Sequence, residues 1–144
     1  MKRNLLLFLS FGCLGITTEI FFTAIMDNII AVNKGGKVDV SLTGHSYAWM
    51  FFIYGFGVLA FRPVYNLLGS KPILLRITIY AICIVIIEFI TGFLLDTIIG
   101  HCPWHYTEGI HIMGFARLDY LPFWMIFAFF MEKVYLFINK LEFS

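Results

Sequence analysis

Four long apolar runs, separated by short polar segments, organise the chain. They cover residues 5–31, 47–61, 73–95 and 120–138. A helix needs about 20 apolar residues to cross a bilayer, and most of these runs are close to that length. The second run is shorter, but Arg62 and Tyr65 can snorkel towards the headgroups and let its helix continue to Leu68. The pattern therefore predicts four transmembrane helices.

The composition agrees with a membrane as the solvent. Hydrophobic residues fill 60% of the 144 positions and charged residues only 13%, whereas about a quarter of the residues are charged in an ordinary soluble domain. A soluble fold of this size could not bury so much apolar surface. We expect one all-α integral membrane domain over residues 1–144, with the lipid bilayer as its partner. A formal net charge of +1, without a strongly basic patch, argues against nucleic acid.

The positive residues predict an orientation. Seven of the ten lie near the N-terminus, in the second connection or in the tail, namely Lys2, Arg3, Arg62, Lys71, Arg76, Lys133 and Lys140. The other three are Lys34, Lys37 and Arg117. Positive residues near helix ends are retained on the cytoplasmic side, so both termini are expected there. Plasma membranes and internal membranes both fit this bias.

Two similar segments predict an internal duplication. EIFFTAIMD begins at Glu19 and EFITGFLLD at Glu88, and their Glu and Asp residues align at an offset of 69. An offset of 70 aligns Cys13 with Cys83, and also Gly44, Val64 and Tyr65 with Gly114, Val134 and Tyr135. We predict repeat 1 at about 1–70 and repeat 2 at about 71–144. The chain would then be two tandem helical hairpins, parallel repeats related by a pseudo-twofold axis along the membrane normal.

Each repeat places acidic residues in an apolar run. An ionised carboxylate in hydrocarbon costs at least a few kcal/mol, so Glu19 and Glu88 require an explanation. Asp27 and Asp96 follow two helical turns later, towards the outer face. The carboxyl groups could serve only to hold helices together, through polar neighbours such as Thr91. Alternatively, these five residues form an intramembrane polar site for a proton, a cation or an amphiphilic substrate.

Two further features concern structure. Arg62 and Glu132 occupy equivalent places near the cytoplasmic ends of the second and fourth helices, and we expect them to form a structural ion pair.

The first connection, residues 27–45, should be an exposed loop that turns at Gly35 and Gly36 and includes a short strand at 38–42.

The third connection, from about residue 96 to residue 119, is unusually rich in polar and aromatic side chains. Its candidate functional residues are His101, Cys102, Trp104, His105, Tyr106, Arg117 and Asp119. Two histidines four residues apart with a thiol between them suggest zinc, but Pro103 interrupts a helix there and no paired Cys completes a site, so we assign no metal and no cofactor. Trp104 and Tyr106 could instead form an interfacial aromatic belt. We favour a structured cap that closes the outer mouth over the four acidic groups.

Several interleaved polar and aromatic motifs carry a family resemblance. They are FIYG at 52–55, KPILLR at 71–76, EFITGF at 88–93, CPWHY at 102–106, and the segment from Met113-Gly114 to Leu118-Asp119-Tyr120. With them the chain resembles the transmembrane protein 229 family and is similar to the bacterial family named putative type IV ABC transporter. The resemblance implies a small multi-pass membrane protein and no particular reaction. The sequence contains no Walker-type phosphate loop, so in an ABC system another polypeptide would hydrolyse the ATP.

Together these features favour a small transporter or permease-like component with a polar site around Glu19 and Glu88. Four helices leave little room for a conduction path, so we expect a homo-oligomer or a separate partner subunit. The alternative is a non-catalytic accessory or scaffold protein. An integral-membrane enzyme acting on a lipid ranks last, because the sequence shows no nucleophile elbow or triad spacing, and we assign no catalytic residue.

Overall fold

The computed structural model describes residues 2–141 and is helical apart from one small hairpin. In chain order its elements are α1 (Lys2–Asn33), α2 (Ala48–Leu68), α3 (Ile73–Ile99), β1 (His111–Ile112), β2 (Ala116–Arg117) and α4 (Leu121–Lys140). All four helices are long and apolar enough to cross a membrane. The four predicted helices are therefore confirmed, including the continuation of the second helix to Leu68.

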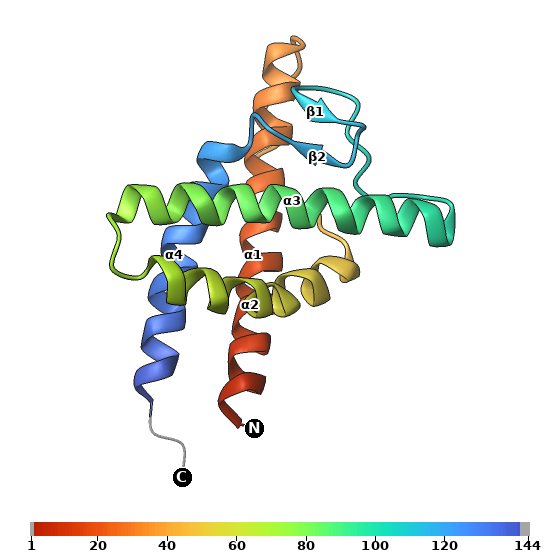
Figure 1. Cartoon of the computed structure of the whole chain (residues 1–144). Helices are drawn as coiled ribbons and strands as arrows, with labels where there is room; N and C mark the ends of the chain where they lie inside the picture. Colours follow the sequence, from red (N-terminus) through yellow and green to blue (C-terminus); the bar gives the residue numbers. More distant parts are fainter. Residues whose placement is uncertain (1, 142–144) are drawn as a thin grey trace.

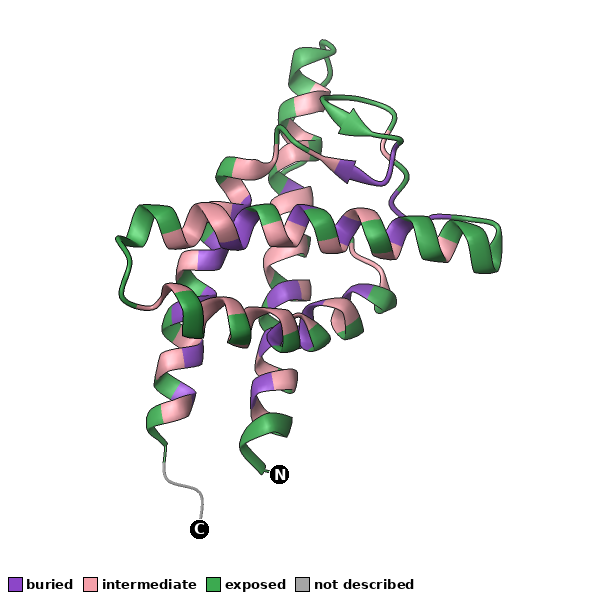
Figure 2. Cartoon of the chain, in the orientation of Figure 1, coloured by how far each residue is buried: buried purple, intermediate pink, exposed green. Residues whose placement is uncertain are grey.

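The helices form two layers. In Figure 1, α2 and α3 run across the view in front of α1 and α4, which run down it. The two chain ends lie at the same end of the molecule, and the β-hairpin lies at the opposite end, beside the last turns of α1. Figure 2 shows that the buried residues lie mainly where the helices face one another, while exposed residues cover the outer faces. Many of these exposed residues are large and apolar, as expected for surfaces that meet lipid.

Small residues bring α1 and α2 together. Glycines on each helix face a bulky residue on the other: Gly12 faces Phe51, Gly15 faces Tyr54, and Gly55 faces Phe8. A side chain at any of the three would collide with its neighbour. In a bilayer, helices associate through close packing rather than through hydrophobic exclusion from water, so these glycines set the α1–α2 contact.

A partly buried ion pair joins α3 to α4, and it is not the predicted one. The Arg76 guanidinium donates from Nε and Nη2 to the two carboxylate oxygens of Glu132, at 2.9 and 2.6 Å. Glu132 is fully buried. Arg62, the predicted partner, instead donates to Asn4 Oδ1 on α1 at 2.9 Å. The prediction of an Arg62–Glu132 pair was wrong because equivalent positions along two helices need not face each other around the helix axes.

The first connection is a turn rather than the predicted strand. The Asp39 carboxylate accepts hydrogen bonds from the backbone N–H groups of Ser41 and Thr43, at 2.9 and 3.3 Å. Leu42 then adopts a positive φ of 49°. Local side-chain bonds of this kind compete with strand pairing, which explains why no strand forms at 38–42.

Candidate functional site

Glu19 and Glu88 each accept a hydrogen bond from a tyrosine. Tyr54 on α2 donates its hydroxyl to Glu19 Oε2 at 2.9 Å, and Tyr106 in the third connection donates to Glu88 Oε1 at 2.6 Å. Gly15 lies one turn before Glu19 and lets the Tyr54 ring approach α1. Thr91, a predicted neighbour, donates instead to the Ile87 carbonyl of its own helix at 2.7 Å. Phenol hydroxyls, rather than threonine hydroxyls, thus donate to these two carboxyl groups.

Glu19 and Glu88 open onto one polar cavity of ≈ 250 Å³, which we call the outer chamber. Its lining comes from α1, the residues just before and within α2, α3, the third connection and the start of α4: Glu19, Phe22, Thr23, Met26, Asp27, Ile30, His45, Tyr47, Met50, Tyr54, Glu88, Pro103, Trp104, His105, Tyr106, Arg117, Tyr120 and Trp124. Asp27 stands at its rim, where its Oδ2 lies 3.5 Å from His45 Nδ1. Asp96 is exposed on α3 and does not line the chamber. Three of the four predicted acidic groups are therefore together.

The third connection forms one wall of the outer chamber. Trp104 is buried and donates its indole N–H to the Phe115 carbonyl at 3.1 Å, while the Tyr106 N–H donates to the Gly114 carbonyl at 2.8 Å. These bonds fold the segment onto the hairpin, in which β1 and β2 pair antiparallel with His111 opposite Arg117. Trp104 therefore packs inside the protein instead of standing in an interfacial belt.

The remaining predicted residues of this connection differ in their surroundings. Cys102 is buried, at 1% exposure, and burial raises the pKa of its thiol. His105 lines the outer chamber, whereas His101 is exposed and outside it. Within residues 2–141 no group of three or more His, Cys, Asp or Glu side chains is placed to hold a metal ion.

Arg117 is the one Arg or Lys among the residues that line the outer chamber, and its guanidinium is already engaged. It forms an ion pair with Asp119, donates to the Tyr120 hydroxyl at 2.7 Å and lies 3.9 Å from the centre of the Tyr120 ring. Hydrogen bonding to Asp119 raises the pKa of Arg117, and the guanidinium lowers the pKa of Asp119.

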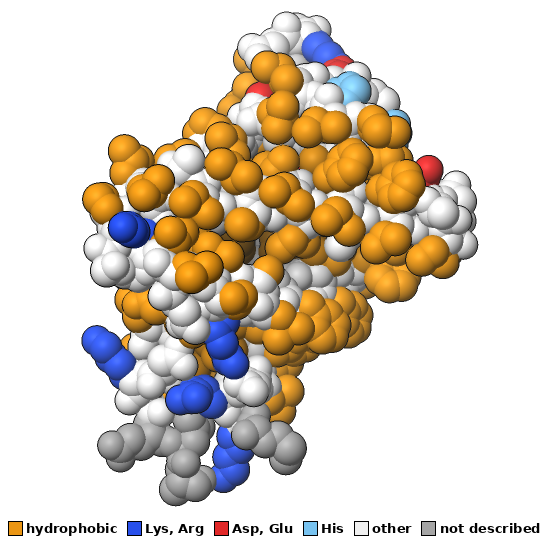
Figure 3. All heavy atoms as spheres, in the orientation of Figure 1, with side chains coloured by type: hydrophobic (Ala, Val, Ile, Leu, Met, Phe, Trp, Pro, Cys, Tyr) orange, Lys and Arg blue, Asp and Glu red, His pale blue; other side chains and the backbone are white. Residues whose placement is uncertain are grey.

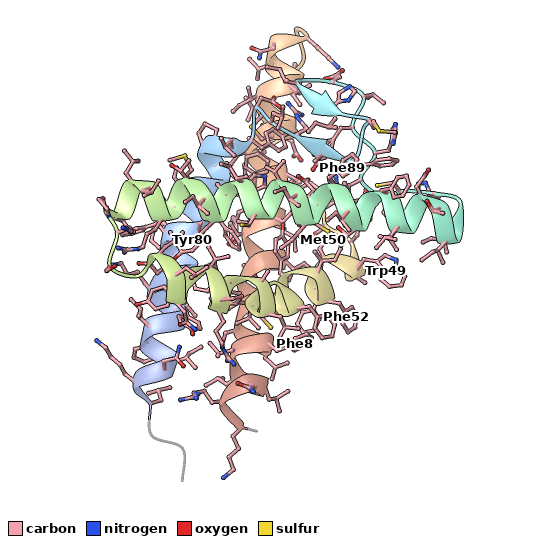
Figure 4. The ribbon with its side chains drawn as sticks, in the orientation of Figure 1. Phe8, Trp49, Met50, Phe52, Tyr80 and Phe89 are labelled. Carbon is pink, nitrogen blue, oxygen red and sulfur yellow. The ribbon has the colours of Figure 1, made fainter. Side chains whose placement is uncertain are left out.

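A second cavity, which we call the inner chamber, adjoins the first. It has a volume of ≈ 80 Å³ and is lined almost wholly by apolar side chains of α2, α3 and α4, with Phe11 from α1. Four residues line both chambers: Met50, Tyr54, Glu88 and Trp124. Figure 4 shows Met50 and Tyr80 in the space between α2 and α3, whereas Trp49 and Phe52 point away from it. Thr91 lines the inner chamber.

Two polar atoms at the junction of the chambers have no hydrogen-bond partner. They are Glu88 Oε2 and Trp124 Nε1. Glu88 is 4% exposed and Trp124 is 5% exposed. Most buried polar groups in proteins are paired, and an orphaned one requires an explanation. An acceptor and a donor thus remain unpaired where the polar chamber meets the apolar one.

Sequence reasoning overlooked several lining residues, above all Tyr54 and Trp124. Both are aromatic residues with a polar tip inside an apolar run, and such tips usually find a partner when buried. They are also separated by 70 residues, the offset that aligns most of the two predicted repeats. That correspondence was the signal available to find them.

One family model matches residues 6–142, and its description is "Putative ABC-transporter type IV". The match covers nearly all of the chain, so the chain belongs to this family. No solved structure matches the chain.

Proposed function

From this family membership we propose that the chain is a small membrane transport component whose solute passes the polar site around Glu19 and Glu88. The outer chamber carries the proposal. Its lining includes two carboxyl groups, from α1 and α3, together with side chains of the third connection. Ionisable residues inside membrane segments are functional candidates by default because burying them is costly.

We also propose that both termini face the cytoplasm and that the chain consists of two tandem hairpins, 1–70 and 71–144. Figure 3 supports the orientation, because most Lys and Arg side chains gather at the end that holds the termini, while the visible Asp, Glu and His side chains lie towards the other end. The shared position of the two termini in Figure 1 is compatible with two hairpins of the same orientation.

Transport would require further protein. The 144 residues contain no phosphate-binding loop, so ATP would be hydrolysed by a separate subunit, and the two chambers together are small for a continuous path. We therefore propose that the chain works as a homo-oligomer or with a partner subunit. The large apolar residues exposed on its helices provide a surface for such subunit contacts within the membrane.

Affinity purification from native membranes in a mild detergent tests this function. A transport component should bring with it a nucleotide-hydrolysing subunit. Glu19→Gln and Glu88→Gln should leave that complex assembled but reduce its substrate-stimulated ATP hydrolysis. Asp96→Asn is the matched control, because it removes a carboxylate from α3 outside the chamber.

The scaffold alternative has support of its own. The Arg76–Glu132 ion pair joins α3 to α4, so polar groups in these helices can serve to hold helices together. A scaffold would copurify with partners that do not hydrolyse nucleotides. Its Glu→Gln variants would change only thermal stability, and that combination of results would refute the transport proposal.

A further inference from the structure

The junction between the chambers combines features of a ligand site. The polar outer chamber and the apolar inner chamber meet at Glu88 and Trp124, which line both. Each of these residues is more than nine-tenths buried and has a polar atom without a partner. A ligand seated there would have its head in polar surroundings and its body among apolar side chains.

The charges around the junction select the sign of the head. Glu19, Glu88 and Asp27 line the outer chamber, and Asp27 Oδ2 lies 3.5 Å from the His45 imidazole. Arg117, the one Arg or Lys among the lining residues, is paired with Asp119 and stacked on Tyr120. The chamber therefore presents an excess of carboxylates, which complements a cation.

The two orphaned atoms select a second feature. Glu88 Oε2 can accept a hydrogen bond from an ammonium group, but an ammonium has nothing to offer the Trp124 N–H, which only donates. An oxygen next to the charged nitrogen would accept from that indole. A single amine leaves the indole N–H unpaired, whereas a single hydroxyl can donate to Glu88 and accept from Trp124 but brings no charge to the carboxylates. A head with both groups satisfies both orphans and supplies the cation.

We propose that the junction binds a small amphiphilic amino alcohol, with its ammonium at Glu88, its hydroxyl at the Trp124 N–H and its hydrocarbon body in the inner chamber. This inference names the substrate class of the proposed transport site and rests on that function for its biological meaning. The binding itself requires neither a partner subunit nor ATP, so the two proposals fail independently.

Three probes with one hydrocarbon chain separate the contributions. They are 2-aminohexan-1-ol, hexylamine and hexan-1-ol, titrated calorimetrically into the full chain in lipid nanodiscs, with empty nanodiscs subtracted. The amine should bind about tenfold more tightly than the alcohol, because only the ammonium joins its positive charge to the Glu88 carboxylate, and charge-assisted hydrogen bonds are the stronger ones. The amino alcohol should gain about a further three- to fivefold through its hydroxyl.

Two variants assign these preferences to residues. Glu88→Gln should abolish the preference for the amine over the alcohol, and Trp124→Phe should abolish the preference for the amino alcohol over the amine. Ratios between probes measured on one variant are insensitive to a general loss of packing. Asp96→Asn should leave both ratios at their wild-type values.

Several results would overturn the proposal. They are the absence of saturable binding in the wild-type protein beyond that of empty nanodiscs, equal affinity for all three probes, or wild-type ratios retained in Glu88→Gln. The wild-type ranking of the probes decides the matter even if a variant fails to fold. Copurification of an ATPase would be unaffected by such a negative result, and binding of the probes would be unaffected by the absence of an ATPase.

Discussion

The hydrogen bond between Tyr106 and Glu88 should hold the third connection closed over the outer chamber. Tyr106→Phe removes one hydroxyl and keeps the ring. Burial beside Glu88 raises the pKa of the Tyr106 phenol well above its usual value, so the wild-type group stays a protonated donor at any physiological pH. In the variant, Glu88 Oε1 loses its side-chain donor while Oε2 already has none.

The magnitude follows from the geometry. A hydrogen bond to a charged group contributes about 1.5–3 kcal/mol in soluble proteins, and interhelical bonds in membranes average about 0.6 kcal/mol. The Tyr106 bond is short, at 2.6 Å, and lies at the boundary between these settings, so we expect a loss of about 1–2 kcal/mol. Opening of the segment should then become about 5- to 30-fold more frequent, because 1.4 kcal/mol corresponds to a factor of ten.

Cys102 supplies the assay. Cys102 lies within this segment and is 1% exposed, so a maleimide can reach its thiol only when the segment opens. In a Cys13→Ala, Cys83→Ala background it is the one remaining cysteine of three, and its labelling rate in nanodiscs reports the opening equilibrium. Tyr65→Phe, on α2 at the other end of the molecule, is the control and should leave the rate unchanged.

A double-mutant cycle with Glu88→Gln completes the experiment. The two substitutions should be non-additive, since each weakens the same bond. Two results would refute the reasoning: a Tyr106→Phe labelling rate within about twofold of the background, or full additivity with Glu88→Gln. In either case another contact keeps the segment closed.

Three further predictions follow from the packing and the ion pairs. Gly15→Ala should lower the melting temperature in detergent, because overpacking against Tyr54 costs about 1–3 kcal/mol, whereas Gly57→Ala, where the added methyl meets open space, should be neutral or stabilising. Glu132→Ala should cost about 1.5–3 kcal/mol of unfolding free energy, because it removes the carboxylate that accepts two hydrogen bonds from the Arg76 guanidinium. Arg62→Ala should cost less in the same denaturation series; equal costs would contradict the assignment of the ion pair. The neighbouring guanidinium holds the pKa of Asp119 below its usual 3.8. The stabilisation of the folded segment by ionised Asp119 is therefore complete above pH 3.8 and is lost as the pH falls through the lowered pKa. Hydrogen–deuterium exchange of residues 104–117, corrected for intrinsic rates, should rise in that acid range in the wild type but not in Asp119→Asn.

Much of the fold could be predicted because the bilayer imposes simple rules. The length of an apolar run determines whether a helix can cross, and the charged residues at its ends determine where it stops. Glu19 and Glu88 were recognisable for the same reason, since each is a carboxylate in an apolar run. These properties depend only on local sequence.

The partners of these residues depended on geometry that local sequence does not contain. Asp27 and Asp96 each follow a glutamate by eight residues, yet only Asp27 lines the outer chamber. The difference arises at the helix ends. After Asp27, α1 continues to Asn33 and the chain returns to place His45 beside it. After Asp96, α3 ends at Ile99, and Gly100 follows it in a left-handed conformation with a φ of +72°.

The unequal lengths of the helices imply how the protein sits relative to the thickness of its membrane. At about 1.5 Å per residue, the 27 residues of α3 extend about 40 Å, against a hydrocarbon core of about 30 Å. A helix this long tilts until its apolar length matches the bilayer. A thinner bilayer would increase that tilt and shift α3 relative to α2, with which it lines the inner chamber. The lipid composition of the host membrane would thereby set the width of the space beside Glu88.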